Sequence, residues 1–389
     1  MSAQLDSLLQ IKAFDSPSHE ILTYSDIAFY AHHQNIPVAL EYGQKAIDLA
    51  SELGSDSLMA VAYRDASYAH MTNGDYQTYL NYSKKSSALW GAVGNDLNQG
   101  KANINVAIAF QELGKLDSAM NIYTEMLPLF ENSEEPYTLA KIQNNMGNLL
   151  LNMERIESAV DYLTNASGTF KHFGDLRNYL TSRSNLANAH MDLGDLDLAD
   201  QMYSELYEYR EDSTLLTYLS ETFRGWAILK ERQGKLKDAE KLLEELVVVY
   251  EDVQSEVGLG YAYTRLAANE TKQRKTNQAE EHFAIAKEYL KNNTSLEDQQ
   301  HFYFQRAKFY ELMKDYELAL EDQKSYDALQ DSILNLNSQE VVIEMEKKLQ
   351  LVQSEKELLN ERAMRAESDL NSRRKSMYLM IFGVMVCIL

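Results

Sequence analysis

The sequence predicts an all-α protein, a solenoid of helical hairpins, from three observations. The 389 residues include only four prolines and sixteen glycines, so few positions break helices. A 40-residue repeat runs through eight consecutive units, and a period of this length is typical of solenoids. The composition, 45% hydrophobic and 25% charged, suffices for a packed core.

The repeat is defined by a small residue that recurs every 40 positions, with a tyrosine in one unit. This first column comprises Ala39, Tyr79, Ala119, Ala159, Ala199, Ala239, Ala279 and Ala319. A second small column, broken only by Ile27, continues with Ser67, Ala107, Gly147, Ala187, Ala227, Ala267 and Ala307. Two small columns allow two helices to approach closely, so each unit is expected to be one hairpin of two amphipathic helices.

A third column marks the turn inside each hairpin, just before the first small column. It holds glycine in four units and a polar residue in three: Gly74, Gly114, Gly194, Gly234, Glu154, Arg274 and Lys314. Glycine is favoured where a helix ends in a left-handed residue. This column is therefore predicted to cap the first helix of each hairpin.

The order of small, glycine, alanine and aromatic positions resembles the tetratricopeptide repeat, whose period is about 34 residues. Six additional residues in each unit predict longer helices than that family has. The resemblance implies a right-handed superhelix with a groove that is lined by the first helix of each hairpin and binds peptides. Residues 1–18 are expected to form a capping helix and residues 19–334 the eight repeats.

Composition and motifs argue against catalysis and against nucleic-acid binding. A net charge of −22 repels phosphate backbones. The sequence contains no phosphate loop, dinucleotide fingerprint or nucleophile elbow, so no catalytic residue, cofactor or metal site is predicted. His70 and His190 share one repeat position and are expected to pack, whereas the adjacent His32 and His33 would point in different directions.

Asparagine side chains form the best candidate site. Asn105, Asn145 and Asn185 occupy one position in three consecutive repeats. An asparagine amide both donates and accepts hydrogen bonds, as an extended peptide backbone requires. The alternative is an asparagine ladder that only ties neighbouring helices together.

This pattern resembles the groove of chaperone-recognising tetratricopeptide domains, which clasp a terminal carboxylate. The resemblance implies a ligand-binding set of Lys101, Asn105, Lys141, Asn145, Asn148, Asn185 and Asn188, extended by Arg224 and Arg265. The third clamping repeat departs from the pattern, since it has Thr181 and Asn185 where that family has a cation. The expected partner is a peptide or protein.

A different pattern begins near residue 335. Apolar residues from Val342 to Leu370 follow a heptad, interrupted by Lys356. This spacing predicts a coiled coil over 335–375 and a parallel homodimer, with a single helix folded back on the repeats as the alternative.

The last segment, 376–389, is apolar and follows the basic cluster 373–375. A transmembrane helix needs about 20 apolar residues, so this segment is interpreted as the truncated start of one. The sequence then predicts a single-pass membrane protein. Similarity to bacterial membrane-bound tetratricopeptide sensors implies repeats outside the cytoplasm, whereas the basic cluster favours the cytoplasmic side.

The predicted function is a sensory input domain. A ligand in the groove would signal through the coiled coil and the membrane helix to an output domain outside this chain. The alternative is a membrane-tethered scaffold for protein partners.

Overall fold

The computed structural model describes residues 2–11, 13–291 and 295–333, and within them the chain is helical with no strand. The all-helical repeat arrangement predicted from the sequence is confirmed. The chain divides into two compact units, Met1–Gln254 and Ser255–Leu389, which are described separately below.

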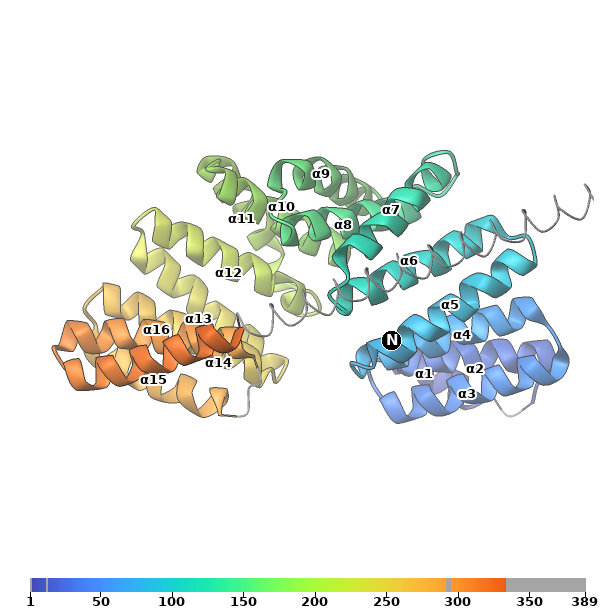
Figure 1. Ribbon diagram of the computed structural model, residues 1–389, viewed down its shortest axis with the longest axis horizontal. Coiled ribbons are helices and arrows are strands. Elements are labelled where there is room, and N and C mark those ends of the chain that lie inside the picture. The colour runs from blue at the N-terminus through green and yellow to red at the C-terminus, as the bar shows by residue number, and fades with distance from the viewer. Residues whose placement is uncertain (1, 12, 292–294, 334–389) are drawn as a thin grey trace, which may run out of the picture. The chain divides into compact units, whose positions relative to one another are not determined.

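The first unit consists of a short helix, α1 (Ser2–Leu9), followed by six helical hairpins (Figure 1). The first helices of these hairpins are α2 (Pro17–Ala31), α4 (Asp56–Thr72), α6 (Asp96–Glu112), α8 (Pro136–Asn152), α10 (Leu176–Leu193) and α12 (Leu216–Arg232). The second helices are α3 (Ile36–Leu53), α5 (Tyr76–Ala92), α7 (Leu116–Glu131), α9 (Ile156–His172), α11 (Leu196–Tyr207), which runs into the 3-10 turn η1 (Glu208–Glu211), and α13 (Leu236–Asp252).

The second unit continues the same pattern. It contains α14 (Glu256–Lys272), α15 (Thr276–Leu290), α16 (Leu296–Met313) and a helix over residues 316–333. From α4 to α16, the first helices begin at 40-residue intervals, which is the period read from the sequence. The extra length relative to a 34-residue repeat lies in the helices, which are mostly 17 residues long.

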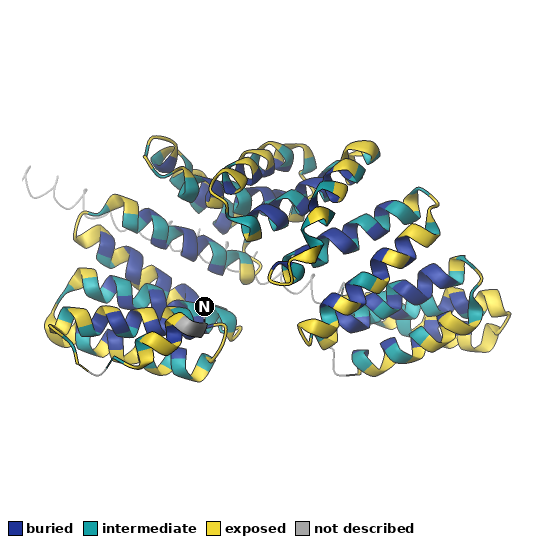
Figure 2. Cartoon of the chain, turned by 180° about the vertical axis from the view of Figure 1, so that it is seen from behind, coloured by how far each residue is buried: buried dark blue, intermediate teal, exposed yellow. Residues whose placement is uncertain are grey.

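The small columns lie where helices meet. Ala39, Ala119, Ala159 and Ala199 have no exposed surface, and Tyr79 is equally buried in the unit that departs from alanine. In Figure 2 the buried residues recur along each helix, with exposed residues on the opposite side. Where the column holds alanine, a larger side chain would crowd the neighbouring helix, because protein interiors are close-packed.

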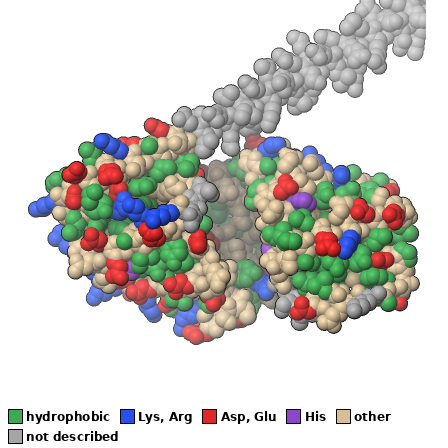
Figure 3. Space-filling view, turned by 90° about the horizontal axis from the view of Figure 1, so that it is seen from below, with side chains coloured by type: hydrophobic (Ala, Val, Ile, Leu, Met, Phe, Trp, Pro, Cys, Tyr) green, Lys and Arg blue, Asp and Glu red, His purple; other side chains and the backbone are tan. Residues whose placement is uncertain are grey.

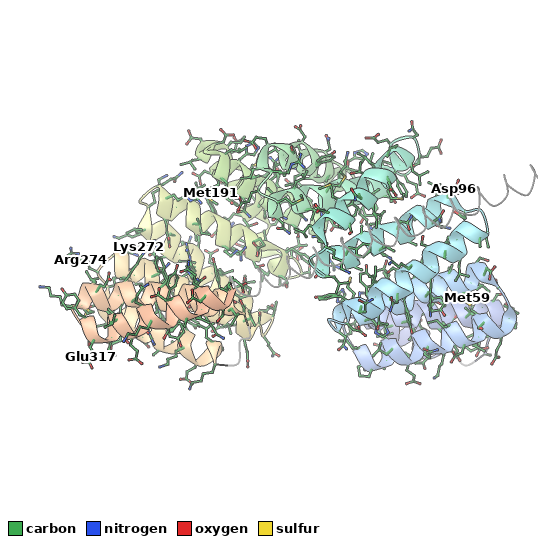
Figure 4. All side chains as sticks on the ribbon, in the orientation of Figure 1. Met59, Asp96, Met191, Lys272, Arg274 and Glu317 are labelled. Carbon is green, nitrogen blue, oxygen red and sulfur yellow. The ribbon has the colours of Figure 1, made fainter. Side chains whose placement is uncertain are left out.

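The predicted caps are confirmed by backbone geometry. Glycine adopts a left-handed conformation in four of the turns, and Glu154 (φ 57°), Arg274 (φ 62°) and Lys314 (φ 61°) adopt it in three others. Arg274 is labelled in Figure 4, in the turn between α14 and α15. The period is therefore kept even where the sequence has no glycine.

Hairpins are also joined by a polar cluster around Glu205 of α11. Its carboxylate accepts hydrogen bonds from Lys171 Nζ at 2.7 Å, Tyr179 Oη at 2.7 Å and Arg183 at 3.1 Å. Partial burial would raise the pKa of Glu205, but these donors outweigh it and lower the pKa to about 2.

The lowered pKa of Glu205 makes stability depend on pH. The stabilisation is present above the unfolded pKa of about 4.3 and is lost as pH falls towards 2. Glu205→Gln should lower the free energy of unfolding at pH 7 by about 1 kcal/mol, after allowance for its partial exposure. Urea unfolding at pH 7 and pH 2.5 checks this, because the difference between variant and parent should nearly vanish at the lower pH. An equal difference at both values would contradict it.

The predicted membrane location is wrong. Within residues 2–11, 13–291 and 295–333, no helix combines the length and the apolar composition that crossing a bilayer requires. The predicted coiled coil (335–375) and the predicted apolar segment (376–389) lie outside the described residues, as does the dimer contact that the coiled coil would make.

Candidate functional site

The first helices of the first unit share one stripe of side chains, partly exposed except for the buried Asn105, which we call the first-helix face. In α6, α8 and α10 it comprises Lys101, Asn105, Ile108, Lys141, Asn145, Asn148, Thr181, Asn185 and Asn188. Residues at this spacing lie on one side of a helix, because they are three, four or seven positions apart. The stripe lies between the positions that pack against neighbouring helices.

Two asparagine contacts connect neighbouring first helices. Asn105 Nδ2 donates to Tyr68 Oη of α4 at 3.2 Å, and Asn185 Nδ2 donates to Asn148 Oδ1 of α8 at 2.9 Å. These contacts place the asparagine positions of successive hairpins side by side. They are also the contacts that the ladder alternative requires.

A third asparagine is held from the second helix of its own hairpin. Tyr203 Oη donates to Asn188 Oδ1 at 2.6 Å. Asn145 Oδ1 lies 3.5 Å from Asn144 Nδ2, and its side chain also lies beside the hydroxyl of Tyr123 on α7. The asparagines therefore differ in the contacts that hold them.

The two lysines on this face have different surroundings. Lys101 Nζ lies 2.8 Å from Glu135 Oε1, and this hydrogen bond lowers the pKa of Glu135. Lys141 Nζ lies over the ring of Tyr137, 4.8 Å from its centroid. Although Lys141 reaches solvent, desolvation by the surrounding protein lowers its pKa; the positive charge of Lys101 adds to this and Asp175 opposes it. A bound anion would relieve the repulsion between the two lysines.

The two predicted arginines are not placed together. Arg224 of α12 pairs with Glu221, one turn earlier, at 2.8 Å. Arg265 belongs to α14 in the second unit, at the position equivalent to Asn185. Every predicted residue except Arg265 therefore belongs to a first helix of the first unit, but Arg224 stands at the position equivalent to Asn144 and Ser184, one before the column of Asn145 and Asn185.

The structure adds three residues of α2 that the sequence reading missed. Leu22, Asp26 and Phe29 are exposed, whereas Ile27 and Ala28 are buried. The turn from α2 to α3 has four residues where the turn from α4 to α5 has three, so the helix is displaced by one position in the repeat. Ala28, near Gly43, thus takes the small position that the sequence reading gave to Ile27.

In the part of the chain that the structure describes, no group of three or more His, Cys, Asp and Glu side chains could hold a metal ion. Acidic and basic side chains are interspersed with hydrophobic ones on the face drawn in Figure 3. The first-helix face offers a ligand hydrogen bonds, charge and apolar contact.

No protein-family model and no curated protein sequence matches the chain. Solved structures do match. The apo form of the quorum sensor NprR from B. thuringiensis is 17% identical, with a TM-score of 0.61 over 74% of this chain and 81% of that one. The apo form of RapI is 10% identical, with a TM-score of 0.58 over 81% of this chain and 98% of that one.

A third structure is the Rap conjugation gene regulator of the plasmid pLS20 in complex with the Phr* peptide. It is 14% identical, with a TM-score of 0.53 over 82% of this chain and 96% of that one. The chain is a tetratricopeptide-like helical repeat protein. At sequence identities of 10–17%, the similarity of this chain to the three structures concerns the fold alone.

Proposed function

We propose that this chain is a binding module that recognises a peptide, or an extended segment of a protein, along the first-helix face of its first unit. The observation that carries the proposal is the run of partly exposed amides on α8 and α10, joined across these helices by the contact of Asn185 with Asn148 and continued on α6 by the buried Asn105. A peptide backbone presents alternating donors and acceptors, which amide side chains can satisfy.

Charge supports a ligand with an acidic group. Lys101 and Lys141 lie on adjacent first helices, and only Lys101 is matched by a close carboxylate among the described contacts. A carboxylate near Lys141 would gain a charge-assisted hydrogen bond. The fold neighbours include a regulator solved with a peptide, which supports a peptide ligand here.

Of the two roles considered, sensor and scaffold, we favour a sensor. One neighbour is described as a quorum sensor and another as a gene regulator. A sensor needs an output, and the heptad pattern at 335–375 is the segment of this chain best suited to relay binding to a partner copy.

The test is affinity selection of a random nonapeptide library, with free termini, by the full chain in solution. We expect enriched peptides to bind, and the double variant Lys141→Ala, Asn145→Ala to weaken them at least tenfold without changing the melting temperature by more than about 2 °C. The matched control is Lys84→Ala, Asn121→Ala, which removes the same two residue types from exposed positions on α5 and α7.

The ladder alternative gives a different result. If the asparagines only tie helices together, Asn148→Ala should lower the free energy of unfolding by about 1 kcal/mol, while no nonapeptide is enriched. Failure to enrich any peptide would contradict the proposed function.

A further inference from the structure

The first-helix face continues beyond its asparagines onto α4 and α2, where its chemistry changes. The side chains there are Leu22 and Phe29, 42% and 38% exposed, together with Tyr68. We call these three residues the aromatic wall. Leu22 and Phe29 are seven residues apart and so lie on the same side of α2.

Ring contacts join the wall across the two helices. Phe29 and Tyr68 meet edge to face, with centroids 5.5 Å apart, and His32 lies 5.7 Å from Tyr68. The hydroxyl of Tyr68 accepts the hydrogen bond from Asn105 described above. The wall is therefore continuous with the asparagine part of the face, and its rings are held in place by their neighbours. Rigid aromatic surfaces contribute contact area at little cost in side-chain entropy.

Charged side chains of opposite sign stand on the face at α2 and at α8. Asp26 is exposed between Leu22 and Phe29, and partial desolvation raises its pKa, an effect that Arg64 opposes. Arg64 itself is bound by Asp65, with N to O distances of 2.8 and 2.9 Å. Asp26 is thus the exposed carboxylate at the wall, and Lys141 is the exposed lysine three first helices away.

We propose that the first-helix face binds an extended peptide in one direction, with its amino terminus near Asp26, an aromatic or large apolar side chain against the wall, and a carboxylate near Lys141. This inference rests on the proposed function and specifies its ligand. It commits to a peptide because the partly exposed amides of Asn145 and Asn148 stand on the same helix as Lys141, and amides suit a peptide backbone.

The separation of the two ends sets the length of the ligand. From α2 to α8 there are three steps between neighbouring first helices, each at least the roughly 8–10 Å that separates closely packed helices. An extended chain advances about 3.3 Å per residue, so the apolar residue and the carboxylate should be at least about seven residues apart.

The experiment sequences the nonapeptides that the full chain selects from the random library with free termini. We expect an aromatic or large apolar residue at the first or second position and Asp or Glu at least seven positions later. For such a peptide, Phe29→Ala should weaken binding about tenfold, and selection with this variant should lose the aromatic preference. Leu22→Ser should also weaken binding of the peptide. Agreement between the two variants would show that the loss does not come from a local change around Phe29.

The control is Val248→Ala. Val248 is 60% exposed and lies on α13, a second helix of the first unit. Its loss should leave affinity and preference unchanged. Enriched peptides with the reverse order, or with acidic residues and no apolar preference, would overturn the inference and leave the proposed function standing. If no peptide is enriched, the proposed function fails and this inference fails with it.

Discussion

Replacing Asp322 by alanine is expected to lower the free energy of unfolding of the second unit by about 3–5 kcal/mol, because it leaves a buried guanidinium without its partner. Asp322 lies in the helix over residues 316–333 and receives two hydrogen bonds from Arg306 of α16, at 2.8 and 2.7 Å. The side chains of the pair are 13% and 3% exposed.

Several contacts keep Arg306 in place. Its guanidinium lies over the rings of Phe302, Tyr303 and Tyr310, at 4.7, 5.7 and 5.6 Å from their centroids. Desolvation opposes the charged form of Arg306, but the bond and charge of Asp322 outweigh it and raise the pKa. Arg306 therefore stays charged in the variant and cannot escape the cost of burial by losing its proton.

The measurement is urea unfolding followed by circular dichroism, with amide exchange in α16 as the local readout. In repeat proteins stability is a sum over neighbouring units, so exchange should increase most in this hairpin. The control is Glu288→Ala, which breaks an exposed pair with Lys291 and should cost no more than about 0.5 kcal/mol. If Asp322→Ala and Glu288→Ala lowered the free energy of unfolding by similar amounts, burial would not be the reason why the Arg306–Asp322 pair matters.

Replacing both residues of the ion pair separates the effect of their burial from the effect of their charge on stability. Changing Arg306 to Met and Asp322 to Leu together removes both charges and retains apolar volume. Such replacements of buried ion pairs are often close to neutral. We therefore expect the double variant to be more stable than Asp322→Ala alone.

The fold could be predicted from the sequence because its signals are local and repeated. A small residue every 40 positions and a cap column specify where helices meet and where they end, and the same register recurs in hairpin after hairpin. Even Glu154 follows the pattern, since the repeat around it imposes a left-handed turn on a residue that does not favour it. Repetition outweighs the preference of any one residue.

The site could be predicted only in part. The lysines and asparagines of α6 to α10 were found because they stand in a column. Leu22, Asp26 and Phe29 were missed because one additional residue in the turn after α2 moves that helix out of register. Ile27 in a column of small residues, with Ala28 next to it, was the available signal.

Hydrogen bonds between hairpins could not be read from the sequence either. That Asn188 accepts a 2.6 Å hydrogen bond from Tyr203, whereas Asn145 Oδ1 lies 3.5 Å from Asn144 Nδ2, depends on side-chain positions that no spacing specifies. Column membership predicts which face a residue occupies, but not which contacts it makes there.

Two glycines inside helices should respond to alanine in opposite directions. Gly225 of α12 lies against the Tyr203 to Asn188 hydrogen bond: an added Cβ would come within 2.5 Å of both Asn188 Oδ1 and Tyr203 Oη. Gly168 of α9 has no atom within 4 Å of the same added carbon. Both substitutions gain about 1 kcal/mol of helix propensity, so the difference between them isolates the clash.

We expect Gly168→Ala to raise the free energy of unfolding by about 1 kcal/mol and Gly225→Ala to lower it by about 2 kcal/mol, as overpacking in a rigid interior does. Urea unfolding of the two variants side by side provides the measurement. Tyr203→Phe combined with Gly225→Ala should recover part of the loss, because the hydroxyl is one of the two obstructing atoms. If Gly225→Ala stabilised the chain as Gly168→Ala does, the close packing of α12 against Tyr203 would be refuted, and with it the account of how Asn188 is positioned on the first-helix face.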